Sequence, residues 1–359
     1  MKRFGHGLVL GKFYPPHAGH QHLVRTARDR CERLTVLVCA ASVESVPLAE
    51  RVAWMRETHP DVRVVGAVDD IPMDLHDPAI WDAHMAVFTR AVPEPVDAVF
   101  TSESYGDELA RRFGAVPVCV DPDRTVFPVS GTAVRKDPVG CWDFLEPPVR
   151  AALARRVVVL GAESTGTTTM ARALTDHYRR RGGVWARTGY VAEYGREFSE
   201  RKLAELRSRW PDAQWEDVTF GTEDFPLIAR AQNDAEESAA RAGSPVLICD
   251  TDSFATTVWH ERYVGGRNPL VEEIADRVPH HLWLLTDHEG VAFEDDGLRD
   301  GEELRPWMTD RFRAELARTG RRFVELTGPH PERLATAVDA VDALLAAGWD
   351  FAPPLPERR

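Results

Sequence analysis

Short apolar runs alternate with longer amphipathic stretches along the first 150 residues. Runs rich in β-branched side chains predict β-strands at 6–13, 34–41, 62–68, 98–102 and 116–121. The stretches between them carry apolar residues at helical spacing and predict helices at 18–31, 47–60 and 106–114. Strands that alternate with helices predict a parallel sheet with helices on both faces.

The same pattern begins again after a proline-bearing segment at 136–156. Apolar runs predict further strands at 157–161, 244–250 and 281–286. The acidic, glycine-bearing stretch 287–305 predicts a loop, and 331–348 predicts the last helix.

The two series of elements predict an α/β chain of two domains, 1–150 and 151–359. A length of 359 residues agrees with this division. The final letters PPLPERR predict a frayed terminus.

Charge and cysteine content narrow the class of protein. The net charge of −13 disfavours broad binding to nucleic acids or anionic membranes, although a few local groups could still hold a nucleotide. The five cysteines form no C-x-x-C pair, which disfavours a zinc site or a disulfide framework. The apolar runs are too short for a signal peptide or a membrane span, so we expect a cytoplasmic protein. A homo-oligomer is possible.

Two segments of the first domain carry phosphate-binding chemistry. The first, GKFYPPHAGH (11–20), leads from a strand to a helix that begins near two histidines, His17 and His20. A helix N-terminus attracts phosphate, and imidazoles can donate hydrogen bonds to it. The second, PVSGTAVRKDP (128–138), adds another helix start and a guanidinium. Taken alone, the first segment could equally be a proline-rich turn with surface histidines.

Together, G-x-F-x-P-x-H-x-G-H and S-G-T-x-x-R resemble the nucleotidylyltransferase superfamily and, more narrowly, the nicotinamide-mononucleotide (NMN) adenylyltransferase half of the NadR family. The resemblance implies a Rossmann-like fold and the reaction of NMN with ATP to give NAD and pyrophosphate, with Mg²⁺ as cofactor. It implies ATP contacts from Gly11, Phe13, His17, His20, Ser130, Thr132 and Arg135. Among these, His17, His20 and Arg135 would be catalytic, through stabilisation of charge on the reacting phosphates.

Two further segments resemble the parts of the family that bind NMN. AERVAWMR (49–56) is similar to the family segment whose arginine contacts the NMN phosphate, which implies that role for Arg51. DIPMDLHDPAIWDAH (70–84) is similar to the segment with a tryptophan over the nicotinamide, which implies Trp81. The alternatives are a solvated helix face for Arg51 and a core position for Trp81.

The second domain opens on VVVLGAESTGTTTM (157–170), which is close to the phosphate-binding loop pattern G-x-x-x-x-G-K-[ST]. NadR proteins carry a P-loop kinase for nicotinamide riboside at this place. The resemblance implies a phosphate loop made of Gly161, Glu163, Ser164, Thr165, Gly166, Thr167 and Thr168. Thr167 stands where the pattern requires lysine.

Later segments resemble other parts of that kinase. GYVAEYGREF (189–198) implies substrate contacts by Glu193 and Arg196, with Glu193 able to act on the attacking hydroxyl. A strand that ends in Asp250 and Asp252 resembles a Walker-B segment, so Asp250 and the Thr168 hydroxyl are expected Mg²⁺ ligands. VAFEDDGLRD (291–300) resembles a lid and implies Arg299 at the phosphoryl group.

The replaced lysine leaves two interpretations of the second domain. In one, it is an active kinase in which Arg172, Arg299 or Arg305 supplies the missing cation. In the other, it is a nucleotide-sensing or structural module. A third class, DNA-binding repression as in some NadR proteins, is disfavoured because the first strand begins by His6 and leaves no room for an N-terminal helix-turn-helix.

Overall fold

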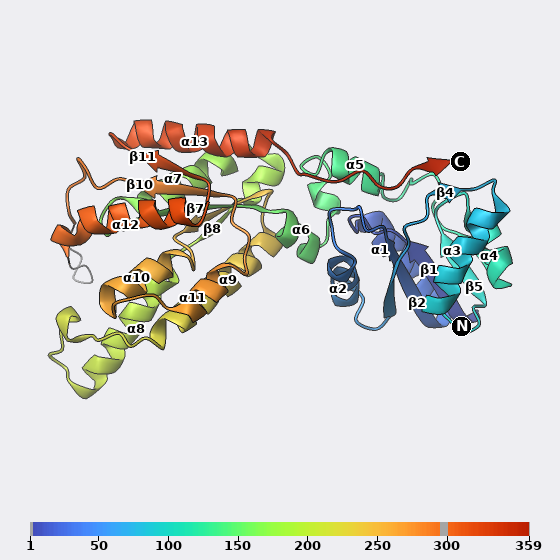
Figure 1. The fold of residues 1–359 in the computed structure, drawn as a ribbon, viewed down its shortest axis with the longest axis horizontal. Coiled ribbons are helices and arrows are strands. Elements are labelled where there is room, and N and C mark those ends of the chain that lie inside the picture. The colour runs from blue at the N-terminus through green and yellow to red at the C-terminus, as the bar shows by residue number, and fades with distance from the viewer. Residues whose placement is uncertain (1–2, 295–300, 359) are drawn as a thin grey trace. The chain divides into compact units, whose positions relative to one another are not determined.

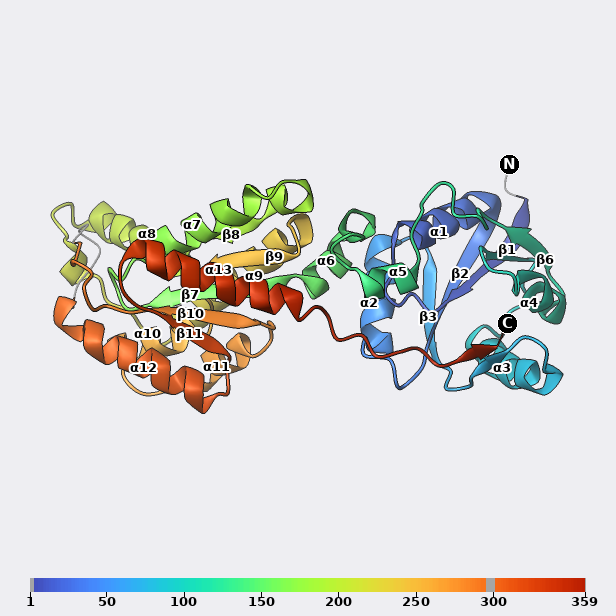
Figure 2. The ribbon, with the colours of Figure 1, turned by 90° about the horizontal axis from the view of Figure 1, so that it is seen from above.

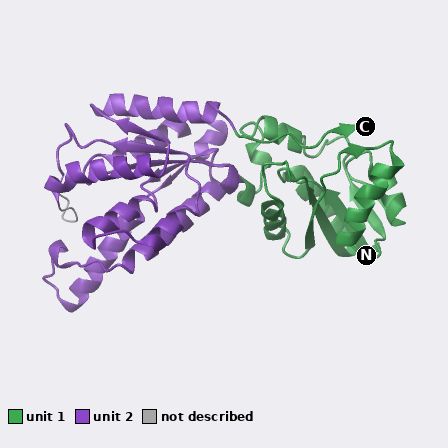
Figure 3. Ribbon diagram, in the orientation of Figure 1, with its two compact units in different colours: residues 1–149, 349–359 green, residues 150–348 purple. Residues whose placement is uncertain are grey.

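The computed structural model describes residues 3–294 and 301–358 of the chain. Contacts divide the chain into two compact units (Figure 3): unit 1 comprises residues 1–149 and 349–359, and unit 2 comprises residues 150–348. The final segment therefore belongs with unit 1, and not with the second domain as predicted, because it packs and pairs there.

Unit 1 is a parallel α/β unit that begins near the N-terminus. Its elements are β1 (Phe4–Gly11), α1 (Ala18–Arg30), β2 (Cys31–Ala40), α2 (Leu48–Thr58), β3 (Arg63–Val68), β4 (Met73–Asp74), α3 (Pro78–Ala91), β5 (Ala98–Thr101), α4 (Gly106–Phe113), β6 (Val116–Cys119), α5 (Gly131–Lys136), the 3-10 turn η1 (Trp142–Phe144), the start of α6 (Pro147–Leu153) and β12 (Glu357–Arg358).

Within the described residues, five strands of unit 1 form one parallel sheet in the order β3-β2-β1-β5-β6. Successive side chains of a strand point to opposite faces. Val9 of β1 packs with α1 and α2 on one face, and Leu8 packs with α3 and α4 on the other (Figure 1). The central position of β1 brings the loop at its carboxyl end to the middle of the sheet edge.

Unit 2 repeats this architecture with a different strand order. Its elements after α6 are β7 (Arg155–Gly161), α7 (Thr167–Arg179), η2 (Gly183–Arg187), β8 (Gly189–Val191), α8 (Tyr194–Arg209), η3 (Trp215–Asp217), α9 (Asp224–Ala242), β9 (Val246–Asp250), α10 (Ala255–Tyr263), α11 (Pro269–Ala275), β10 (Leu282–Thr286), η4 (Glu302–Leu304), α12 (Arg305–Arg318), β11 (Phe323–Leu326) and α13 (His330–Ala346).

The strands of unit 2 form a parallel sheet in the order β11-β10-β7-β9-β8. One face packs against α7 and α13, and α9 and α12 contact the strands from the opposite side (Figure 2). The two parallel sheets confirm the predicted α/β fold class. Within the described ranges, every helix is too short or too polar to cross a bilayer.

Several elements were not predicted. The segment 70–84, proposed to carry Trp81, contains β4 and the first half of α3. This helix starts where Asp77 accepts a hydrogen bond from the Ala79 N–H at 2.8 Å and Pro78 opens the first turn. The predicted loop 287–305 ends in η4 and the start of α12, and its residues 295–300 lie outside the described part of the chain.

The frayed terminus predicted for the last residues is not observed. There β12 pairs in parallel with β4, so that Glu357 lies opposite Met73 and Arg358 opposite Asp74. The Leu75 N–H also donates to the Arg358 carbonyl at 3.1 Å. This order comes from long-range pairing, which the local sequence does not show.

Candidate active sites

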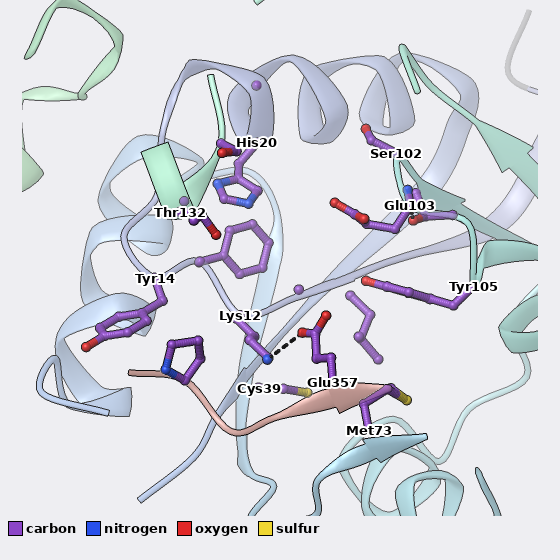
Figure 4. Close-up of a pocket in the computed structure, with 18 of the residues that line it drawn as sticks. Lys12, Tyr14, His20, Cys39, Met73, Ser102, Glu103, Tyr105, Thr132 and Glu357 are labelled. Atoms are coloured by element: carbon purple, nitrogen blue, oxygen red, sulfur yellow. Dashed lines mark hydrogen bonds and ion pairs between the residues drawn. The ribbon is translucent and has the colours of Figure 1, made fainter. Parts of the chain in front are cut away.

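A cavity of about 730 Å³ lies in unit 1, beyond the carboxyl end of β1 (Figure 4). Ligands of parallel α/β sheets bind outside the carboxyl ends of the strands, where the strand order reverses. The seven residues predicted to bind ATP all line this cavity: Gly11, Phe13, His17, His20, Ser130, Thr132 and Arg135. Two motifs more than 100 residues apart in sequence therefore meet in one place.

The starts of two helices form part of the cavity wall. His17 precedes α1, and Ser130 caps α5 by accepting the Ala133 N–H at 3.1 Å. Gly131 permits a close approach, because a Cβ there would lie 3.0 Å from the Tyr14 carbonyl oxygen. The first N–H groups of a helix lack partners within it and suit an anionic ligand.

The two histidines are neutral donors and acceptors near pH 7. Their rings stack with centroids 3.7 Å apart. Burial lowers the pKa of His17 to about 3, with a further contribution from the charge of Arg124, and burial also holds the pKa of His20 well below its usual range. The His17 backbone N–H donates to Nδ1 of His20 at 3.3 Å. The His20 proton therefore lies on Nε2, which is left to donate.

Each lysine and arginine side chain among the described residues that line this cavity is paired with an acceptor of the protein. The pairs are Lys12 Nζ with Glu357 Oε1 at 2.8 Å, Arg124 Nη2 with Glu103 Oε1 at 2.8 Å, and Arg135 Nη1 with the Tyr14 carbonyl oxygen at 2.5 Å. A phosphate that enters must share or replace these acceptors.

Arg51, predicted to contact NMN, lies outside the lining of the cavity. Its side chain is fully buried, and Nη1 pairs with Glu44 Oε2 at 2.6 Å. Nη1 also donates to the Lys12 carbonyl at 3.1 Å, and the guanidinium lies 4.3 Å from the Tyr14 ring centroid. In this arrangement Arg51 supports the loop that carries Lys12.

Trp81 also lies in the core and not in the cavity lining. It is 2% exposed, packs between β1 and α4 side chains, and donates from Nε1 to the Leu75 carbonyl at 3.2 Å. Its helix nevertheless brings His84 to the cavity, where Nδ1 lies 2.7 Å from Oδ2 of Asp69. Of the two interpretations of Trp81 given by the sequence, the structure places it at a core position.

Sequence reasoning missed several residues of this cavity. Lys12 sits inside the first motif and could have been noticed as a cation beside two histidines. The lining residues 354–357 gave no signal, because they reach the cavity from the other end of the chain.

A second cavity, of about 450 Å³, lies in unit 2 beyond the carboxyl end of β7. Most residues predicted for the kinase line it: Gly161, Glu163, Ser164, Thr167, Thr168, Glu193, Arg196, Asp250 and Asp252. Two predicted P-loop residues lie behind this lining. Thr165 is buried and donates to the Ala162 carbonyl at 2.7 Å, and Gly166 starts α7 with φ +85°. Arg299 lies outside the described residues.

Side chains from β10, α13 and α10 pack closely against the loop between β7 and α7. A Cβ at Gly161 would lie 2.1 Å from Oγ1 of Thr286, so only glycine fits there without a shift of β10. Arg333 of α13 donates to the carbonyls of Thr165 at 3.3 Å and Asp287 at 2.9 Å. Glu163 forms a largely buried ion pair with Arg262 at 3.1 Å. These contacts hold the loop in the shape of a phosphate nest.

Thr167 interacts with the carboxylate that stands at the end of β9. Burial raises the pKa of Asp250, and hydrogen bonds from Thr168, Tyr190 and Thr167, together with the charge of Arg172, oppose this rise. The Tyr190 hydroxyl donates to Oδ2 at 3.0 Å. The lysine position is therefore occupied by a hydroxyl that supports Asp250.

Of the two candidate cations for the missing lysine that lie in the described part of the chain, Arg172 and Arg305, only Arg172 lines this cavity. It lines the cavity, one turn after Thr168, and its guanidinium lies 5.6 Å from the Tyr190 ring centroid. Arg305, another candidate, lies outside the cavity lining and donates to the Val291 carbonyl at 2.9 Å.

Asp252 is held by a buried polar network. Its Oδ1 accepts the Ala255 N–H at 2.8 Å and its Oδ2 accepts from Trp283 Nε1 at 2.9 Å. Behind it, His280 Nε2 lies 2.7 Å from Glu236 Oε2. Burial alone would lower the pKa of His280, but Glu236 and Asp252 raise it. These hydrogen bonds, together with the buried His280–Glu236 pair, hold the Asp252 carboxylate in one position in the wall of the second cavity.

The residues at the end of β9 and the start of α7 fit a magnesium ion that also binds phosphates. Within the described residues, no group of three or more His, Cys, Asp or Glu side chains could hold a metal. Mg²⁺ in phosphoryl-transfer sites needs fewer, because one or two carboxylates and the phosphate oxygens complete its shell. Asp250 and Thr168 offer such a carboxylate and hydroxyl, and they hydrogen-bond to each other.

Comparisons with known proteins find relatives for both parts of the chain. A family model described as an AAA domain matches residues 156–333. The trifunctional NAD biosynthesis/regulator protein NadR of Escherichia coli K12 is 24% identical over 311 residues, 82% of this chain and 71% of that protein. The nicotinamide-nucleotide adenylyltransferase of Methanocorpusculum labreanum is 28% identical over 136 residues, 36% of this chain and 77% of that protein.

Solved structures match the whole fold. A NadR protein in complex with NR matches with a TM-score of 0.72 and 21% identity, covering 98% of both chains. A NadR protein in complex with NAD and AMP-PNP matches with a TM-score of 0.70 and 21% identity, covering 95% of this chain and 97% of that one.

The two parallel sheets, each with a cavity beyond the carboxyl end of its central strand, define a two-domain α/β fold, and the similarity to NadR and to nicotinamide-nucleotide adenylyltransferases supports an enzyme of NAD biosynthesis. The similarity to known proteins runs through both domains. Over most of its length the chain is similar to NadR proteins.

Proposed function

We propose that this protein makes NAD, and that unit 1 transfers the adenylyl group of ATP to NMN with release of pyrophosphate. The observation that carries the proposal is the meeting of G-K-F-Y-P-P-H-A-G-H and S-G-T-A-V-R around one cavity. The similarity to adenylyltransferases of NAD biosynthesis supports NMN as the acceptor.

The chemistry of unit 1 is positioning and electrostatic stabilisation. An oxygen of the NMN phosphate attacks the α-phosphorus of ATP, one P–O bond forms, and the bond to the β-phosphate breaks. His20 Nε2–H and the N–H groups at the start of α1 donate to the reacting phosphates. Arg135 and Thr132 hold the leaving pyrophosphate. Mg²⁺, when bound to the phosphates, neutralises part of their charge.

We propose further that unit 2 phosphorylates nicotinamide riboside with ATP to give NMN. The loop after β7 cradles the phosphates, and Arg172 supplies positive charge in place of lysine. Glu193 lies in the same cavity and accepts the proton of the attacking hydroxyl. The alternative, a nucleotide-sensing or structural module, is favoured only by Thr167 itself.

Product analysis tests both proposals. The protein is incubated with ATP, Mg²⁺ and either NMN or nicotinamide riboside, and the nucleotides are separated by chromatography. NAD from both substrates is the expected result. NAD from NMN alone would overturn the kinase and favour the sensing module, and no NAD from NMN would overturn the proposed function of unit 1.

A further inference from the structure

The segment that follows α13 is fixed to unit 1 by contacts along its length. Phe351 packs on the Tyr14 ring with centroids 5.8 Å apart. The Ala352 carbonyl accepts from the Tyr14 hydroxyl at 2.9 Å, and the Ala352 N–H donates to Ser45 Oγ at 3.0 Å. The segment then ends in β12, which pairs with β4. It runs from the loop after β1 to the opposite rim of the cavity.

Residues 354–357 of this segment form part of the cavity wall. Figure 4 shows Glu357 pointing to Lys12, and Glu357 Oε1 lies 2.8 Å from Lys12 Nζ. The neighbouring lining residues Met73, Cys39 and Tyr105 lie away from His20 and Thr132 in the same view. The segment therefore covers the end of the cavity that holds Lys12 and lies away from His20 and Thr132.

The charge of Glu357 opposes a nucleotide that enters at this end. Lys12 is the cation on this side of the cavity, and nucleotides carry their negative charge on phosphates. The Glu357 carboxylate and a nucleotide phosphate would both be attracted to the Lys12 ammonium and would repel each other. The phosphate therefore binds Lys12 more favourably after Glu357 has moved away.

The contacts of the segment are weak enough to be exchanged. The side chains of Lys12 and Glu357 are 41% and 35% exposed, and ion pairs at such exposure contribute little to stability. The ladder between β12 and β4 spans two residues on each side. Glu357 can still compete with a nucleotide phosphate for Lys12, because its attachment to the chain keeps its effective concentration near Lys12 high.

We propose that residues 351–358 form an internal strap that competes with the acceptor nucleotide of unit 1. With the strap in place, Glu357 neutralises Lys12. When NMN binds, its phosphate takes over Lys12 and the strap leaves β4. This inference rests on the proposed adenylyl transfer in unit 1 and adds a regulatory contact to it.

Kinetics of full-length variants test the strap. Glu357→Gln removes the charge and leaves the backbone pairing in place, and Glu32→Gln, an exposed position of β2, is the charge-matched control. We expect Glu357→Gln to lower the KM for NMN about threefold, with kcat within about twofold of the wild type, as for loss of an exposed ion pair. An unchanged or higher KM for Glu357→Gln relative to the control would overturn the strap.

Hydrogen exchange of the wild-type protein gives a second readout. The Leu75 N–H is protected by the Arg358 carbonyl and should exchange faster with saturating NMN than without it. Slower or equal exchange with NMN would contradict release of the strap, even while NAD is formed. No NAD from the wild type or any variant would instead overturn the adenylyltransferase proposal and the strap with it.

Discussion

In the proposed kinase, Arg172 and Thr167 together take the place of the single lysine of the usual phosphate loop. The Thr167 hydroxyl supports Asp250, and the guanidinium of Arg172 brings positive charge to the same cavity from the next turn of α7. A guanidinium is longer than the replaced threonine and can bind phosphate oxygens bidentately. In this proposal the loop keeps its backbone nest and its cation comes from another position.

Arg172→Ala should reduce phosphorylation of nicotinamide riboside about 100-fold, because it removes a charge that stabilises the transferring phosphoryl group. The rate is measured as NMN formed from the riboside and ATP. Arg180→Ala, at the exposed end of the same helix, serves as control. An equal effect of the two variants would show that Arg172 has no such role.

Arg51→Met should destabilise unit 1 by about 3–5 kcal/mol, because it leaves the Glu44 carboxylate buried without its partner. Chemical denaturation followed by circular dichroism measures the change. The double variant Arg51→Met/Glu44→Gln should lose less than the sum of the single variants. Strict additivity would mean that the pair is not coupled.

At the scale of elements, the packing of β7 against β10 shapes the phosphate loop. Gly161→Ala places a methyl group against Thr286 and should destabilise unit 2 by about 1–3 kcal/mol. Gly195→Ala, where the new methyl would make ordinary contacts, is the control. In urea titrations, Thr286→Ala should restore part of the loss, and a Gly161→Ala variant as stable as the control would contradict the packing argument.

The central strands could be predicted because each is a continuous apolar run buried on both faces. This holds for β2, β7, β9 and β10. The edge strand β8 has three residues and β11 has one fully buried side chain, so neither gives a clear pattern. Helices such as α8 carry a charged sequence whose apolar positions form no continuous face, and they were not predicted.

The candidate sites were predictable to the extent that their residues lie in compact motifs. The phosphate side of the first cavity comes from two short segments that each contain a helix start. The pairing of Lys12 with Glu357 joins positions 345 residues apart, and no local pattern shows such a pair. Arg51 and Trp81 stand in family-like segments, yet their burial depends on packing that the sequence does not reveal.

At the scale of the whole molecule, buried neutral histidines make stability depend on pH. The pKa of His17 is lowered by burial to about 3, that of His59 to about 4 and that of His281 to about 3. In the unfolded chain these groups titrate near 6.5. Between these values the unfolded chain binds more protons than the folded one at these three positions, so their contribution to stability is largest above pH 6.5 and falls as the pH drops.

We therefore expect the thermal unfolding midpoint to fall steadily between pH 7 and pH 5. Differential scanning calorimetry measures it in both units. His59→Gln lies outside the proposed chemistry and should make the fall less steep. A midpoint that rises on acidification over this range would contradict the neutral state of these imidazoles.

The position of β12 also bears on how the protein is handled in the laboratory. A purification tag or reporter fused after residue 359 is separated by a single residue from Arg358, whose strand borders the first cavity. A bulky or charged fusion there can pull this strand from β4 and alter the measured substrate affinity. Kinetic constants should thus be compared between N-terminally tagged and tag-free protein, since residues 354–357 line the first cavity.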